Sequence, residues 1–184
     1  MDNQLHRRVP LYRRVLGAEF DHLPPVVRAL HDLSARSVWS GTVDVRRGKS
    51  WLARLACRVM GLPPEGTGQP LTVIFTPDDR GREVWLRLFG GFPFRSLLTE
   101  HGPHRIAERI GLVTVTYQLT VAEGTLAQTV DRTTCLGLPL PRFLWPRITS
   151  LETEHEGAYH FLVDAALPLV GPLVRYEGRL TRET

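Results

Sequence analysis

The feature that most constrains this chain is a long series of short segments, from residue 70 to residue 182, in which apolar and polar residues alternate. Alternation with a period of two is typical of strands, because successive side chains point to opposite faces. The segments are separated by brief turns such as Asp78-Asp79-Arg80-Gly81, and turns this short join antiparallel neighbours. We predict strands over 70–78, 82–90, 92–102, 104–111, 112–124, 125–137, 148–157, 158–168 and 172–182.

The N-terminal part has a different pattern. Residues 11–33 show helical spacing of apolar residues and predict two short helices that Pro24-Pro25 separates. Residues 38–48 alternate like a first strand. Residues 50–61 predict a helix with Ser50 as its N-cap and Gly61 at its end. Its predicted apolar face consists of Leu52, Leu55, Ala56, Val59 and Met60.

About ten antiparallel strands in succession favour a curved sheet, and closure of such a sheet removes its free edges. We therefore predict a mainly β (α+β) fold, in which a strongly curved antiparallel sheet closes into a lipocalin-like barrel or half-barrel, with N-terminal helices and one helix near 50–61. The competing helix-grip fold would end in a long helix. This chain ends in the alternating "LVRYEGRLTRET", which favours the barrel.

The chain length fits a single domain over 1–184. We expect residues 1–10 to be a flexible tail, 11–64 to be a helical N-terminal part with the first strand, and 69–182 to hold the antiparallel strands.

Composition excludes several classes of function. The net charge is +4, but the basic residues are scattered along the sequence, so we expect no nucleic-acid partner. The N-terminus lacks the apolar region of a signal peptide, and no run of about 18 apolar residues predicts a transmembrane segment. The two cysteines, Cys57 and Cys135, fit reduced thiols. We therefore expect a cytoplasmic protein.

Several strands carry polar residues on a face that is otherwise apolar. Arg87 shares its face with Trp85 and Phe89, and Glu108 lies on an isoleucine-rich face. A charge among apolar side chains is costly unless it is paired, and pairing of Arg87 with Glu108 or with Asp164 would satisfy both groups. Such a pair can be purely structural, or it can be the polar anchor of a ligand pocket.

Two tyrosines share inward faces with aliphatic residues: Tyr117 on 112–124 and Tyr176 on 172–182. Together these positions form the predicted ligand-binding set: Trp85, Arg87, Phe89, Glu108, Tyr117 and Tyr176.

Familiar motifs for cofactors are absent or incomplete. "GKS" at 48–50 imitates a phosphate-binding loop, but Val43 stands where that loop needs glycine. Glu100, His101 and His104 lie at a turn, where strand alternation points the two histidines apart, so we expect no metal. The sequence contains neither the GxGxxG dinucleotide fingerprint nor a GxSxG nucleophile turn, and we expect no cofactor.

The chain resembles a bacterial family, the domain of unknown function 4166. The resemblance covers about residues 11–180 and includes "LYRRVLGAEFDHLPPVVRALHDL", "VWLRLFGGFPFRS", "ERIG", "GLPLP" and "GPLVRYEGRL". It implies no activity. It implies that members occur alone or joined behind a saccharopine-dehydrogenase-like reductase domain, which this chain lacks. Positions that match its pattern are His31, Arg47, Trp85, Arg87, Phe89, Glu108, Arg109, Pro141, Tyr176 and Gly178.

Three hypotheses of function remain open. The first is binding of a hydrophobic small molecule, lipid-like or bearing a carbonyl or carboxylate, in an apolar barrel cavity with an Arg/Glu/Tyr anchor. The second is a cofactor-independent cyclase or isomerase that acts on a hydrophobic intermediate, with Glu108 or His31 transferring the proton. The third is a filled barrel without catalytic function that pairs with a reductase partner or forms a homodimer.

Overall fold

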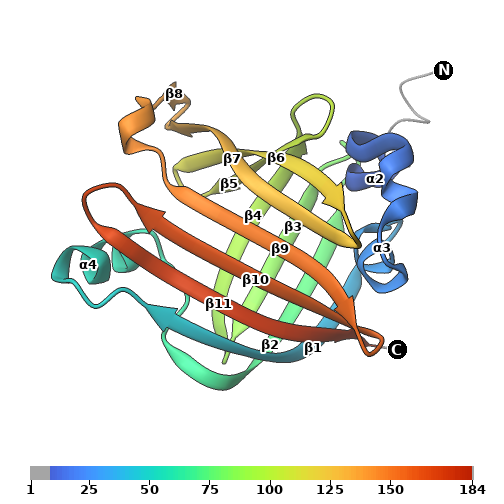
Figure 1. Cartoon of the computed structure of the whole chain (residues 1–184), viewed down its shortest axis with the longest axis horizontal. Coiled ribbons are helices and arrows are strands. Elements are labelled where there is room, and N and C mark those ends of the chain that lie inside the picture. Colours follow the sequence, from blue (N-terminus) through green and yellow to red (C-terminus); the bar gives the residue numbers. More distant parts are fainter. Residues whose placement is uncertain (1–8, 184) are drawn as a thin grey trace.

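The computed structural model describes residues 9–183, and it confirms a closed antiparallel β-barrel of ten strands. The predicted tail over 1–10 lies mostly outside the described residues. Neighbouring strands follow the chain from β1 to β7, then continue through β9, β10 and β11, and β11 pairs with β1 (Figure 1). The strands are β1 (Ser37–Arg47), β2 (Gly66–Pro77), β3 (Glu83–Phe89), β4 (Phe92–Glu100), β5 (Arg105–Ile110), β6 (Val113–Ala122), β7 (Thr125–Cys135), β9 (Arg147–His155), β10 (Ala158–Leu167) and β11 (Gly171–Arg182).

The closure leaves no half-barrel, because β6 pairs with β7 along its whole length and β7 pairs with β9. A two-residue strand, β8 (Leu138–Pro139), is added beside β7. The described chain ends on strand β11, where the helix-grip fold would have a helix. Gly178 permits the tight contact of β1 with β11, since a Cβ there would overlap the Thr42 carbonyl oxygen and the Phe161 ring.

Short helices cover one end of the barrel. These are α2 (Leu11–Leu16), the 3-10 helix η1 (Gly17–His22) and α3 (Pro25–His31), and Pro25 begins α3 at the position where proline is favoured. They bury Tyr12, Phe20 and Leu30 completely. This end of the barrel is therefore closed by packed side chains.

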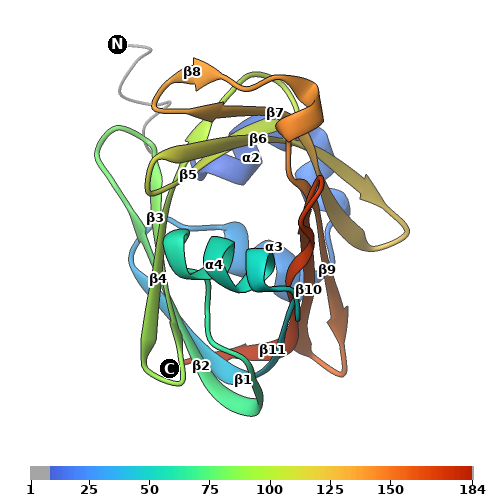
Figure 2. The same cartoon turned by 90° about the vertical axis from the view of Figure 1, so that its left-hand side faces the viewer.

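The opposite end carries α4 (Trp51–Val59), which lies across the mouth of the barrel (Figures 1 and 2). Ser50 caps it as predicted, because its hydroxyl accepts a hydrogen bond from the Ala53 amide at 3.1 Å. Arg47 holds the connection after the helix by donating to the carbonyl oxygens of Leu62 and Pro63. A second 3-10 helix, η2 (Arg142–Leu144), lies in the segment between β8 and β9.

The predicted apolar face of this helix is not its buried side. The helix buries Ala53 and Cys57 against β11, whereas Leu52, Leu55 and Val59 are exposed. Small side chains let the helix approach β11 closely, so the bulky residues face outward.

The strand faces agree better with the sequence. Trp85 and Phe89 point into the barrel with Arg87, and Tyr117 and Leu119 point inward from β6. The outward residues of β3 are half-buried between those of neighbouring strands: Val84, Leu86 and Leu88.

Within residues 9–183, none of the helices combines the length and the apolar character needed to cross a membrane.

Candidate ligand cavity

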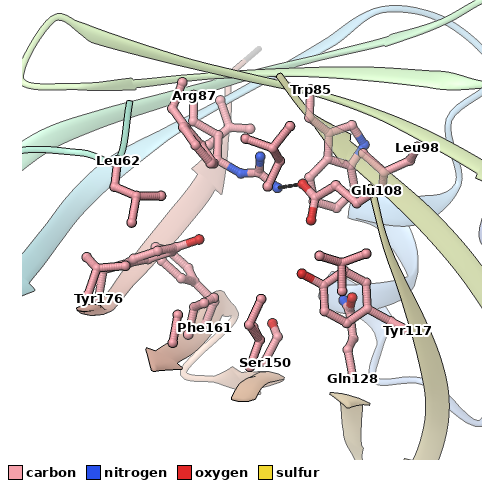
Figure 3. Close-up of a pocket in the computed structure, with 18 of the residues that line it drawn as sticks. Leu62, Trp85, Arg87, Leu98, Glu108, Tyr117, Gln128, Ser150, Phe161 and Tyr176 are labelled. Atoms are coloured by element: carbon pink, nitrogen blue, oxygen red, sulfur yellow. Dashed lines mark hydrogen bonds and ion pairs between the residues drawn. The ribbon is translucent and has the colours of Figure 1, made fainter. Parts of the chain in front are cut away.

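The barrel encloses a cavity whose walls are mainly aliphatic and aromatic (Figure 3). The cavity volume is about 130 Å³. Tyr12 contributes to its closed end, whereas Met60, Leu62 and Pro146 line it near α4. Polar side chains reach the cavity at two main places, one around Glu108 and one around Glu152.

The first polar centre is the pair formed by Arg87 on β3 and Glu108 on β5. A guanidinium nitrogen of Arg87 lies 3.3 Å from Glu108 Oε1, and another donates to the Ser96 hydroxyl at 3.0 Å. The guanidinium also lies over the rings of Trp85 and Phe94, 4.9 and 5.6 Å from their centroids. Burial lowers the pKa of Arg87, but the Glu108 carboxylate together with Tyr176 and Tyr12 raises it above its ordinary value, so Arg87 stays charged.

Two tyrosines lie near this pair. The hydroxyl groups of Tyr176 and Tyr117 point into the space beside Arg87 and Glu108 (Figure 3). Burial raises the pKa of Tyr176 to about 12, although Arg87 lowers it. Burial and the Glu108 carboxylate raise the pKa of Tyr117 well above its ordinary value. Both phenols are therefore protonated at neutral pH and can donate a hydrogen bond to a ligand.

The second polar centre surrounds Glu152 on β9. His31 Nε2 lies 2.6 Å from one carboxylate oxygen of Glu152, and the Gln128 amide donates to the other at 2.7 Å. Burial and the Glu152 carboxylate raise the pKa of Tyr159 well above its ordinary value. Glu152 and Gln128 line the cavity, whereas His31 lies behind them and is 0% exposed. His31 therefore orients the carboxylate from the side away from the cavity.

The ring of His31 is fixed by stacking. Its centroid is 3.7 Å from that of Tyr12, and Trp85 lies 5.8 Å away. Its Nδ1 is buried without a hydrogen-bond partner among the described residues. A proton on Nδ1 would be an unsatisfied buried donor, so the network assigns the proton to Nε2, which donates it to Glu152.

A third carboxyl group, Glu83, lies behind Trp85. It is buried, and it accepts hydrogen bonds from the Leu11 amide at 3.3 Å and from the Trp85 indole at 3.1 Å. Burial raises the pKa of Glu83, while the Trp85 hydrogen bond lowers it in part. Glu83 anchors the start of α2 and the orientation of Trp85, and so supports the cavity wall from outside.

The structure brings together all six residues of the predicted ligand-binding set around this one cavity. Of the two candidate proton-transfer residues, Glu108 lines the cavity, but His31 does not. Asp164, the alternative partner of Arg87, lies on the outside of the barrel and pairs with Arg175 at 3.6 Å. The protein partner of Arg87 is therefore Glu108.

Sequence reasoning missed Glu152, Gln128 and Tyr12. A signal existed at Gln128, which stands between the inward residues Leu126 and Val130 of β7. At Glu152 the alternation of polar and apolar residues was less clear, because the neighbouring Leu151 is apolar and points outward.

No group of three or more His, Cys, Asp or Glu residues within 9–183 is arranged to hold a metal ion. His104 pairs with Glu19 at 3.5 Å and Glu100 with Arg14 at 2.9 Å, so the histidine-rich turn forms surface ion pairs.

A family model described as a domain of unknown function (DUF4166) matches residues 23–180. That span includes every cavity residue named above except Tyr12. No curated protein matches the chain.

Proposed function

The chain belongs to the domain of unknown function 4166 family, and from its cavity we propose that it binds a small, largely apolar molecule with one neutral hydrogen-bonding group, such as a hydroxyl or a carbonyl. The observation that carries this proposal is an enclosed apolar space with polar side chains gathered at two places on its wall. Ligand pockets have this composition, because apolar contacts supply affinity and a few polar groups fix orientation.

The charges in the cavity favour a neutral ligand over an anion. The charge of Arg87 is already offset by Glu108 at 3.3 Å, and Glu152 adds a second carboxylate to the wall. An anionic head group would meet both carboxylates and would have to displace Glu108 from Arg87. A hydroxyl group could instead donate to either carboxylate, and a carbonyl group could accept from Tyr176 or Tyr117.

Competition between two matched molecules tests this proposal. 2-Naphthol, a neutral fluorescent probe of a size that suits a cavity of about 130 Å³, should bind to the purified protein and be displaced by 1-octanol, but not by octanoate of the same chain length as the alcohol. Native mass spectrometry of the protein as purified would detect a molecule retained from the cell. A protein that binds no probe, or that releases it equally to both competitors, would refute the proposed ligand chemistry.

Two strand positions give matched variants for this experiment. Ser150 lines the cavity and Thr149, beside it on β9, is exposed on the outer face. Ser150→Phe should fill the cavity and abolish probe binding, whereas Thr149→Phe should leave it unchanged. Val163→Phe offers a second filling variant on β10 in case Ser150→Phe does not fold. Binding that survives in both filling variants would place the probe elsewhere.

A second candidate function rests on Glu152. Two neutral donors, His31 Nε2 and Gln128 Nε2, hold this carboxylate at 2.6 and 2.7 Å, and it faces an apolar cavity. A fixed carboxylate in such a site can act as a general base toward a proton next to a carbonyl group, which is the first step of a cofactor-independent isomerisation. This arrangement gives the proton-transfer role to Glu152, with His31 as a positioning residue.

Deuterium exchange distinguishes this activity from simple binding. The protein should accelerate exchange of the α-protons of a small ketone such as cyclohexanone in D₂O, followed by proton NMR. Glu152→Gln should remove the acceleration and keep binding of the 2-naphthol probe. Acceleration that persists in Glu152→Gln would exclude this carboxylate as the base.

A further inference from the structure

All large apolar side chains that stand well exposed among residues 9–183 lie at the α4 end of the barrel. They project from five segments, 48–65, 90–92, 111–112, 136–146 and 168–170, which are called the mouth segments below. Surface apolar residues are ordinary when scattered, but a concentration at one end marks an interaction surface. They are Trp51, Leu52, Leu55, Val59, Phe92, Leu112, Leu136, Leu138, Phe143, Leu144 and Leu169.

The α4 helix presents the largest part of this surface. Its narrow buried side is formed by Ala53 and Cys57, whereas Trp51 and Val59 are 67% and 78% exposed on its outer side. At the turn between β10 and β11, Leu169 is 92% exposed. Neither the helix nor the turn needs these side chains for its own packing within the barrel.

The charges of the mouth segments are almost all positive. Lys49, Arg54, Arg58 and Arg142 are exposed there, and Glu65 is the one acidic residue that these segments contain. The opposite end of the barrel carries exposed acidic residues on its helices and turns: Asp21, Asp32, Asp79, Glu123 and Glu156. Exposed basic residues occur at both ends, Arg36 and Arg80 among them at the far end, but only at the mouth do they lie among exposed apolar residues with a single acidic neighbour.

The cavity approaches the surface at the same end. The cavity is lined here by Met60, which belongs to the mouth segments, and by Ile110 and Val113 beside them. Its other end is closed by Tyr12 and α2. Strand β9 pairs with β7 only over Thr149–Glu152, so the two strands are not hydrogen-bonded to each other nearer the mouth. Figure 2 looks onto this end, with α4 in the middle of the ring of strands.

We propose that the mouth segments dock on an anionic membrane surface, so that the mouth of the barrel faces the lipid. The apolar side chains enter the interface between head groups and acyl chains, and Lys49, Arg54, Arg58 and Arg142 meet the anionic head groups. Building on the function proposed above, the apolar ligand then passes between the bilayer and the cavity without crossing water.

The distribution of these residues favours a membrane over a second copy of the chain. A second copy would bring its own basic mouth segments against these, and like charges would meet. The apolar residues also come from separate turns with arginines between them, which suits a fluid surface better than a single flat protein face.

Vesicle binding by the full chain, measured without any added cavity ligand, tests the proposal. The protein should sediment with vesicles of phosphatidylcholine and phosphatidylserine, and less with phosphatidylcholine alone or at high salt. Trp51 emission should shift to shorter wavelength on binding, and Trp51→Phe should lose that shift. Leu55→Ser/Val59→Ser should weaken binding by about tenfold or more, and these exposed positions leave the core intact.

Charge reversal at the two ends supplies the matched control. Arg54→Glu/Arg58→Glu should weaken vesicle binding by about tenfold or more, since each basic residue contributes to attraction. Arg36→Glu/Arg80→Glu makes the same change of net charge at the opposite end and should leave binding unchanged. Equal losses in both variants, or no vesicle binding, would overturn the proposal.

Sedimentation velocity gives the other outcome that would overturn it. A dimer that Leu55→Ser/Val59→Ser converts to a monomer would make this face a subunit interface. Probe binding to the cavity is measured separately in the absence of vesicles, so failure of the membrane proposal and failure of the ligand proposal are distinguishable.

Discussion

Two carboxylates face the same cavity, and their partners differ in kind. Glu108 is paired with Arg87, whose charge is permanent and is also held by Ser96 and by two aromatic rings. Glu152 is held by His31 and Gln128. Of these partners, the imidazole can gain or move a proton, whereas the guanidinium cannot lose one under ordinary conditions.

The two centres should therefore contribute differently to stability. The Arg87–Glu108 pair is neutral as a unit, and loss of either member leaves a charge in a largely apolar space. Glu152 is held by two separate donors, so loss of one of them leaves the other in place. We therefore expect the first centre to dominate stability and the second to dominate any proton chemistry.

The largest effect is expected from Glu108→Leu, which leaves the buried guanidinium without its carboxylate. Arg87 cannot escape by losing its proton, so the free energy of unfolding should fall by about 3–5 kcal/mol. Urea unfolding followed by circular dichroism measures this loss. The double variant Arg87→Met/Glu108→Leu should recover most of it, and a double variant as unstable as the single one would show that the loss comes from packing.

Arg87→Met should cost less, about 1–3 kcal/mol, because the hydroxyl groups of Tyr117 and Tyr176 beside the pair can donate hydrogen bonds to the carboxyl group that remains. Urea unfolding of the wild type and the variant at neutral pH measures the loss. A loss equal to that of Glu108→Leu would contradict the expected asymmetry between the partners.

The first centre was largely predictable from the sequence, and the second was not. Strand alternation places Arg87 with Trp85 and Phe89, and it offers Glu108 as a partner, because local periodicity determines which face a residue occupies. His31 and Glu152 are 121 positions apart, and one lies on a helix whose docking no periodicity specifies. Only the closure of the barrel and the packing of α3 bring them together.

The contacts of α4 were unpredictable for a related reason. Helical periodicity identifies an amphipathic helix over 50–61, but it does not tell what the apolar face contacts. The helix instead contacts β11 through Ala53 and Cys57, since a close approach needs small side chains. Sequence predicts an apolar stripe, and only the tertiary structure tells whether that stripe meets the protein or its surroundings.

Glu152→Gln should have a moderate effect, about 1–3 kcal/mol. Two donors, His31 Nε2–H and the Gln128 amide, point at this side chain, and the new amide group can accept fully from only one of them. Urea unfolding measures the loss, and Glu156→Gln in the exposed turn after β9 is the control, with a change within about 0.5 kcal/mol. A loss as large as that of Glu108→Leu would contradict the expectation that the Arg87–Glu108 pair contributes more to stability than the hydrogen bonds of Glu152.

The smallest effect should come from Glu83→Gln. Unlike Glu108 and Glu152, Glu83 has neither an arginine nor a histidine as a hydrogen-bonding partner. Burial raises the pKa of Glu83 above the ordinary value of 4.5. Its contribution to stability is therefore fully present below pH 4.5 and is lost as pH rises through the folded-state pKa, with about 1.4 kcal/mol lost for each unit of difference. The amide group does not titrate, so the wild type should lose stability relative to Glu83→Gln as pH increases from 4.5 to 8.

Urea unfolding at several pH values measures this difference in stability between the wild type and Glu83→Gln, with Asp79→Asn at an exposed turn as the control. A wild type that gains stability relative to Glu83→Gln over that range would mean that the hydrogen bonds from Leu11 and Trp85 outweigh burial.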